Sequence, residues 1–119
     1  MSTDSSRAFR GLQAGPEPLD PLRWRPAVDI YRTGDGWLLK AELAGVRPED
    51  LRVDRRGSLV IIGGRRCDHT LVKGIECYAL EIEYSHFERT IKLPENLDNA
   101  RIEAGFQQGM LLVHLITTG

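Results

Sequence analysis

The chain has 119 residues, enough for one compact domain and too few for a second of ordinary size. Hydrophobic residues make up 41% of the chain and charged residues 28%, values that exclude a chain that is disordered throughout. The 16 Lys and Arg stand against 17 Asp and Glu, so the net charge of -1 gives no field that attracts nucleic acid or an anionic membrane. We therefore expect one folded domain with neither nucleic acid nor a membrane as a partner.

Residues 1–23 predict a flexible N-terminal arm, because they are rich in Gly, Pro and polar residues. This stretch has no apolar run of the kind found in a secretory signal or a membrane span, so we expect a cytoplasmic location. Cys67 and Cys77 lack both the paired spacing of a zinc site and the density of a disulfide scaffold, which favours two reduced thiols.

Residues 28–43 predict two strands joined by a tight turn. Val28 and Ile30 alternate with other residues, and the run ends at residues 33–36, Thr-Gly-Asp-Gly, whose glycines favour a hairpin. In the second strand the apolar side chains share one parity, which indicates one buried face. These side chains are Trp37, Leu39, Ala41 and Leu43.

The middle of the chain predicts two more strands and then a long excursion. Residues 47–50 favour a single helical turn before the alternation resumes at Leu51 and Val53. The apolar run at residues 59–62 is short and rich in β-branched side chains, which favours a strand covered on both faces. Residues 63–77 are largely polar, so we expect them to leave the core. Their larger apolar side chains are Leu71, Val72 and Ile75.

In the last third of the chain, apolar residues again recur at every second position, as in a β-strand. Leu80, Ile82 and Tyr84 alternate with polar residues, and residues 87–93 continue in the manner of a strand. The final hairpin places alternating residues on either side of a turn at residues 107–109. Seven or so short strands separated by turns indicate an all-β sandwich rather than a parallel α/β sheet.

Several stretches, taken in order, carry a family resemblance. Residues 24–30 read Trp-Arg-Pro-Ala-Val-Asp-Ile, residues 41–51 contain Ala-Glu-Leu-Ala-Gly-Val and Pro-Glu-Asp-Leu, residues 83–89 read Glu-Tyr-Ser-His-Phe-Glu-Arg, and residues 104–111 read Ala-Gly-Phe-Gln-Gln-Gly-Met-Leu. This order resembles the alpha-crystallin domain of the small heat-shock protein family, over residues 24–116. The resemblance implies an immunoglobulin-like β-sandwich that acts as an ATP-independent holding chaperone, without a cofactor and without enzyme activity.

The chain departs from the family pattern at a few positions. Ala44 stands where the family usually has proline, Ser85 where it has glycine, and Gln108 where it has Asn or Asp before the turn glycine. We expect the fold to tolerate all three. The tail at residues 117–119 lacks the Ile-x-Ile type motif that typically docks on a neighbouring domain, so we expect small oligomers rather than large assemblies.

The resemblance also implies a homodimer in which residues 63–77 of one copy pair beside the first strand of the other. The side chains expected at this interface are Val28, Ile30, Leu71, Val72 and Ile75. Period-two alternation elsewhere favours ordinary core packing, with a groove under an exposed edge as the alternative. The candidate contacts for unfolding client proteins, in this groove and in the arm, are Phe9, Leu12, Leu51, Val53, Ile102 and Ala104.

The polar motifs show no catalytic or metal-binding signature. His69, His86 and His114 are scattered, without a second ligand at metal spacing, which favours solvated or satisfied histidines. The glycines at 63–64 lack the Lys-Ser or Lys-Thr of a phosphate loop, so a strand-ending turn is favoured. The nearby arginines are interpreted as solvated loop charges: Arg55, Arg56, Arg65 and Arg66.

Two other functional classes remain open. The chain could be a co-chaperone or adaptor of the related CS-domain sandwich type, although the long excursion at residues 63–77 disfavours this fold. It could also be a structural or spore-associated member of the small heat-shock family with little chaperone activity, in keeping with the short arm and the missing tail motif.

Overall fold

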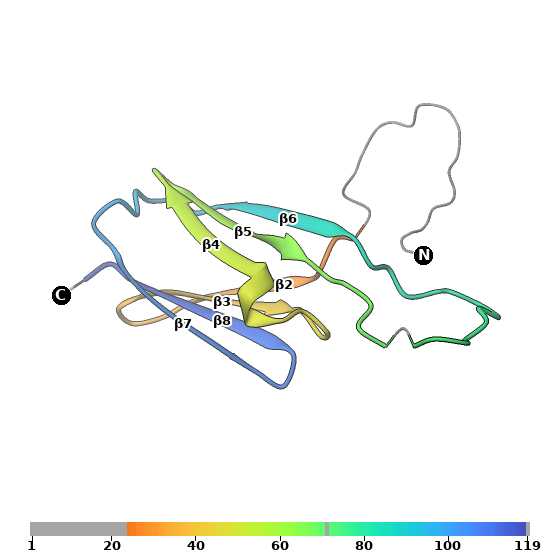
Figure 1. The fold of residues 1–119 in the computed structure, drawn as a ribbon. Coiled ribbons are helices and arrows are strands. Elements are labelled where there is room, and N and C mark those ends of the chain that lie inside the picture. The colour runs from red at the N-terminus through yellow and green to blue at the C-terminus, as the bar shows by residue number, and fades with distance from the viewer. Residues whose placement is uncertain (1–23, 71, 119) are drawn as a thin grey trace, which may run out of the picture.

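The computed structural model describes residues 24–70 and 72–118, and this part of the chain forms a two-layered β-sandwich (Figure 1). One sheet has the strand order β2-β3-β8-β7 and the other the order β4-β5-β6. The elements are β2 (Val28–Arg32), β3 (Gly36–Glu42), the 3-10 helix η1 (Pro48–Asp50), β4 (Leu51–Arg56), β5 (Leu59–Arg65), β6 (His86–Lys92), β7 (Arg101–Gln107) and β8 (Met110–Ile116). The predicted all-β sandwich and its single helical turn are confirmed.

The core lies between the two sheets and is filled by one parity of each strand. Trp37, Leu39 and Ala41 of β3 are buried, as the alternation predicted. They belong to one cluster with side chains of β5, β6 and β8, among them Val60, Ile62, Phe87, Ile91, Leu111, Val113 and Leu115. Burial of this apolar surface is the main stabilising contribution that a sandwich of this size can make.

The run at residues 59–62 is not covered on both faces, so that prediction is wrong. Val60 and Ile62 are buried, but Leu59 and Ile61 are only half-buried. The reason is that β5 lies in the middle of a three-stranded sheet with only one face against the core. A continuous apolar run alone could not distinguish this arrangement from a strand covered on both faces.

The turn between β7 and β8 confirms that Gln108 is tolerated in place of the usual Asn. Gln108 has φ 53° and Gly109 has φ 75°, so both residues adopt the left-handed conformation that a two-residue hairpin requires. Glycine adopts this conformation without steric cost, whereas the Cβ of Gln108 makes it less favourable. The pairing Gln107 with Met110 directly flanks the turn.

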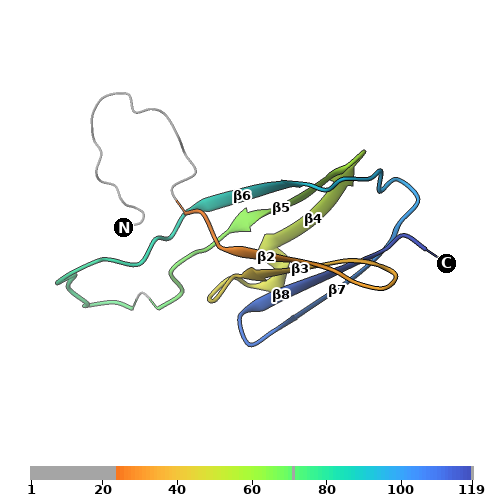
Figure 2. The same cartoon turned by 180° about the vertical axis from the view of Figure 1, so that it is seen from behind.

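The long excursion covers residues 66–85 rather than 63–77, so the predicted bounds are wrong at both ends. Residues 63–65 belong to β5, where they pair with residues 86–88 of β6. The alternating Leu80, Ile82 and Tyr84 predicted a strand, yet the described residues between 66 and 85 form none. We call residues 66–85 the long segment. It extends beyond the ends of β5 and β6, away from the sandwich, as both views show (Figures 1 and 2).

Different contacts join the two sheets on their two sides. On the β2/β6 side, Arg89 Nη1 donates a 2.6 Å hydrogen bond to the carbonyl of Pro26, and Trp24 packs edge-on against Phe87. On the β4/β7 side, Arg55 Nη1 donates to the carbonyl of Ala100. Thr117 N donates to the carbonyl of Asp35, so the first residue after β8 is held to the body. In residues 24–70 and 72–118, no helix has the length and apolar character needed to cross a membrane.

Candidate functional site

The β4/β7 edge is the first candidate surface. Here the outer strands of the two sheets lie on the same side of the sandwich (Figure 1). Their half-buried apolar side chains pack against the core: Leu51, Val53, Ile102 and Phe106. Ala104 of β7 is exposed instead. Alternation identified Leu51, Val53 and Ile102 as possible groove residues, and the structure places all three on these two edge strands.

The second candidate surface combines the edge strand β2 with the long segment. Val28 is half-buried, whereas Ile30 is exposed, as are Val72 and Ile75 of the long segment. Leu71, Phe9 and Leu12 lie outside the described residues. Within one chain these predicted dimer residues are not brought together, because the long segment runs away from the strands (Figure 2).

Arg66 anchors the base of the long segment to the body. Its guanidinium carbon lies 3.6 Å from the ring centre of Trp24, a cation-π contact. Its Nε donates to the carbonyl of Glu83 at 2.9 Å and its Nη1 to the carbonyl of Ala44 at 3.2 Å. Burial lowers the pKa of Arg66 from its ordinary value.

The expectation of solvated arginines is therefore wrong for Arg66 and for Arg55, which bonds the carbonyl of Ala100. Sequence reasoning missed both residues because their partners are backbone carbonyls and an aromatic ring distant in sequence. No pattern of residue types at fixed spacing could have identified them.

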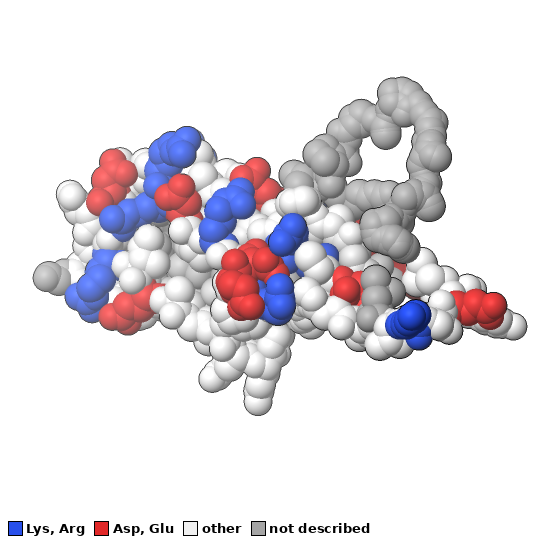
Figure 3. Space-filling model, in the orientation of Figure 1, with Lys and Arg blue, Asp and Glu red and all other residues white. Residues whose placement is uncertain are grey.

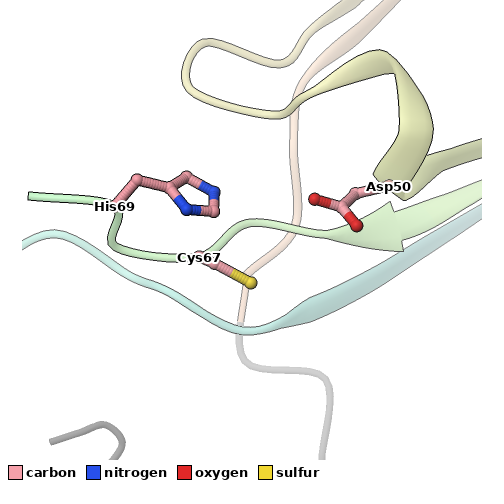
Figure 4. Close-up of side chains that lie close together, drawn as sticks. All are labelled: Asp50, Cys67 and His69. Atoms are coloured by element: carbon pink, nitrogen blue, oxygen red, sulfur yellow. The ribbon is translucent and has the colours of Figure 1, made fainter.

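The third feature is a group of donor atoms at the start of the long segment. One donor atom each from Asp50, Cys67 and His69 lies within 4.8 Å of the other two (Figure 4). Cys67 and Cys77 are both free thiols. Sequence spacing gave no reason to connect Asp50 with Cys67, because 17 positions of chain, including two strands, separate them.

Charged side chains do not form a patch of one sign on the face shown in Figure 3. Lys and Arg side chains are interspersed there with Asp and Glu over the body of the molecule. This mixture agrees with the near-zero net charge. The expected lack of a nucleic-acid partner nevertheless stays a prediction.

Comparison with known proteins gives a match to the model of the Hsp20/alpha crystallin family over residues 29–118. The chain belongs to the small heat-shock protein family. Heat shock protein 16 of Schizosaccharomyces pombe is 33% identical over 100 residues, which cover 80% of this chain and 68% of that protein. Spore protein SP21 of Stigmatella aurantiaca is 30% identical over 95 residues, or 80% of this chain.

Solved structures of the family have the same fold. Heat shock protein 16.0 from Schizosaccharomyces pombe has a TM-score of 0.71 at 30% identity, with 80% of this chain and 88% of that chain covered. A small heat-shock protein from Xylella fastidiosa has a TM-score of 0.67 at 27% identity, with 82% and 89% covered. Some curated relatives are much longer, since the match spans only 56% of the spore protein.

Proposed function

We propose that this small heat-shock protein is an ATP-independent holding chaperone that works as a homodimer and binds unfolding proteins before they aggregate. The observation that carries this proposal is the exposed apolar surface of the long segment. Its large apolar side chains have exposed fractions from 41% for Tyr84 to 99% for Tyr78. Several large apolar side chains exposed on one segment are typical of a surface that binds another protein.

The edge strand β2 is the surface that we expect the long segment of a second copy to cover. In the described part of the chain, β2 pairs only with β3, which leaves its outer edge open. Ile30 and Tyr31 on β2 are 46% and 44% exposed. An extended segment placed along an open edge satisfies backbone groups of both partners and covers apolar side chains on each. A two-fold dimer does this twice with one kind of contact.

Client binding is expected to use other apolar surface. Leu51, Val53 and Ile102 are half-buried on the β4/β7 edge, so they present apolar surface without leaving the core. An unfolding protein exposes its own apolar side chains, and their burial against such a surface is favourable without an energy source. The proposal includes Phe9 and Leu12 of the arm as further contacts. A cytoplasmic location and the absence of enzyme activity are part of the same proposal.

Gly63 and Gly64 form neither the predicted strand-ending turn nor a phosphate loop, because both lie within a strand. Gly63 and Gly64 lie inside β5 and pair with β4 and β6. A Cβ at Gly64 would lie 2.2 Å from the carbonyl oxygen of Asp50. Glycine at position 64 therefore allows the close packing of these two strands.

The dimer is tested by replacing two apolar side chains of the long segment together, Leu80→Ser with Ile82→Ser. We expect the dimer to dissociate at concentrations where the parent chain is dimeric by sedimentation, because both residues are exposed within one chain. Glu81→Ser, between them, is the matched control and should leave the dimer intact. An unchanged dimer in the double variant would show that the long segment is not the interface.

Holding activity needs a separate measurement. Light scattering from a heat-labile client should fall when the protein is present, equally with and without ATP. Protection that requires ATP would contradict the proposal. Lack of protection would favour the spore-associated alternative, which is the second candidate because the chain is similar to a spore protein.

A further inference from the structure

Asp50, Cys67 and His69 bring three different kinds of metal ligand together at the surface of the sandwich. Asp50 is the last residue of η1, so the start of β4 fixes its position. Cys67 and His69 lie two and four residues after the end of β5. The donor atoms of the three side chains lie within 4.8 Å of one another. In Figure 4 the imidazole of His69 and the carboxylate of Asp50 extend toward each other across the gap, with the thiol of Cys67 close by.

We propose that these three residues form a binding site for Zn²⁺. Thiolate, imidazole and carboxylate together suit a borderline-soft ion such as Zn²⁺, whereas Mg²⁺ and Ca²⁺ prefer oxygen ligands alone. Three protein ligands leave the fourth tetrahedral position for water or for another ligand. This site belongs to no part of the proposed chaperone mechanism and does not depend on it.

The distances are compatible with a metal ion after a small movement. Zinc lies about 2.0 to 2.3 Å from its ligand atoms, so the ligand atoms of a tetrahedral site are about 3.3 to 3.8 Å apart. The present separations, up to 4.8 Å, must therefore shorten by about 1 Å. His69 is exposed and can move, whereas the Asp50 side chain is only 10% exposed and is fixed in place. The neighbouring Asp68 accepts hydrogen bonds from the backbone and hydroxyl of Thr70, which bends the chain at this point.

Two arginines also lie close to the carboxylate of Asp50. Arg47 Nε lies 3.4 Å from Oδ2, and Arg65 Nη2 lies 3.6 Å from Oδ1. A carboxylate has about four lone-pair positions, so it can keep such a partner while it binds a metal. Ligating carboxylates are commonly oriented by outer hydrogen bonds of this kind. A hollow on the surface, lined by Glu49, Arg52 and His86 among others, also borders Asp50.

A bound ion would connect the start of the long segment to the body at a second point, beside Arg66. Cys67 and His69 would be held to Asp50, on the side of the sandwich where β4 begins. The site uses only the first residues of the long segment, so residues 72–85 remain available for another copy of the chain. The ion would therefore restrict the direction in which the segment leaves the body.

The test is a titration of the reduced full chain with Zn²⁺, and with Co²⁺ as a spectroscopic substitute. We expect one ion per chain and, with Co²⁺, a thiolate charge-transfer band in the near ultraviolet. Cys67→Ser and His69→Ala should each raise the Kd at least about tenfold, since even the loss of an outer partner costs 10- to 100-fold. Cys67→Ser should also remove the charge-transfer band. Cys77→Ser removes the other free thiol and should leave both Kd and band unchanged.

A second readout separates this site from adventitious binding by histidines. Hydrogen exchange of the amides at residues 66–70 should slow when Zn²⁺ is added to the parent chain or to Cys77→Ser, and not in Cys67→Ser. A Kd that is unchanged in Cys67→Ser, or that rises in Cys77→Ser, would overturn the proposal. So would Zn²⁺ binding that leaves exchange at residues 66–70 unchanged.

Discussion

The strand β8 and the end of the long segment have the same alternating pattern and opposite environments. Leu111, Val113 and Leu115 of β8 are at most 3% exposed. Leu80, Ile82 and Tyr84 alternate in the same way and are 41% to 63% exposed. The difference is that β8 pairs with β3 and β7 of its own chain, whereas the described residues of the long segment join no sheet. Alternation thus predicts the spacing of apolar side chains along a strand, but it does not indicate whether the same chain covers them.

The largest expected difference between the two regions is in stability. Leu115→Ala should lower the free energy of unfolding by about 2 to 5 kcal/mol, because the core can only partly fill the cavity. Leu80→Ala should change it by less than about 0.5 kcal/mol when the chain is diluted below the dimer concentration. Urea unfolding followed by fluorescence of the two tryptophans measures both. Equal losses would show that Leu80 contributes to the body and not to an interface.

The sandwich could be predicted from the sequence because its strands pair within one chain. The parity of Trp37, Leu39 and Ala41 gave the buried face of β3 correctly. The bounds of the long segment could not be predicted, because the pattern at Leu80 and Ile82 is that of a strand. In the structure these two residues pair with no strand in the described part of their own chain. The number of buried faces of β5 could not be predicted either, since a short apolar run is compatible with one or two buried faces.

The candidate sites were less predictable than the fold. Leu51, Val53 and Ile102 were identified because apolar and polar residues alternate along edge strands as they do along other strands. Asp50, Cys67 and His69 were not connected, because their proximity depends on how η1, β5 and the long segment meet in space. The same holds for Arg66, whose contacts with Trp24 and with two backbone carbonyls span residues far apart in the sequence.

The junction between the two regions gives the second prediction. Arg66→Met keeps much of the apolar stem but removes the cation-π contact and both hydrogen bonds. Without metal, we expect a loss of about 1 to 2 kcal/mol in the free energy of unfolding, together with faster hydrogen exchange in residues 66–85. Arg56→Met is the matched control, because Arg56 is exposed at the end of β4. If Arg56→Met speeds exchange in the long segment as much, the anchor is not specific to Arg66.

The smallest expected effect compares two similar Asp-Thr pairs, one in the body and one in the long segment. Asp35 accepts a 2.9 Å hydrogen bond from the Thr33 hydroxyl, and Asp68 accepts one of 2.6 Å from the Thr70 hydroxyl. The Thr33 hydroxyl, and then His114, lower the pKa of Asp35 below its ordinary value of 3.8. The Thr70 hydroxyl and backbone likewise lower the pKa of Asp68.

A carboxyl whose pKa is lowered by folding stabilises the folded state above its unfolded pKa, and this contribution is lost as the pH falls through the folded pKa. Thr33→Val should therefore reduce the rise in Tm between about pH 2 and about pH 5, since the pKa of Asp35 moves back toward its ordinary value. Thr70→Val should raise the pKa of Asp68, which NMR of its carboxyl carbon measures. The dependence of Tm on pH should nevertheless stay the same as in the parent chain. We expect this because the part of the long segment beyond the Arg66 anchor should open separately from the body, so the hydrogen bonds of Asp68 would not contribute to global unfolding. If Thr70→Val flattens the profile as much as Thr33→Val, the long segment unfolds together with the sandwich, and the two regions form one cooperative unit.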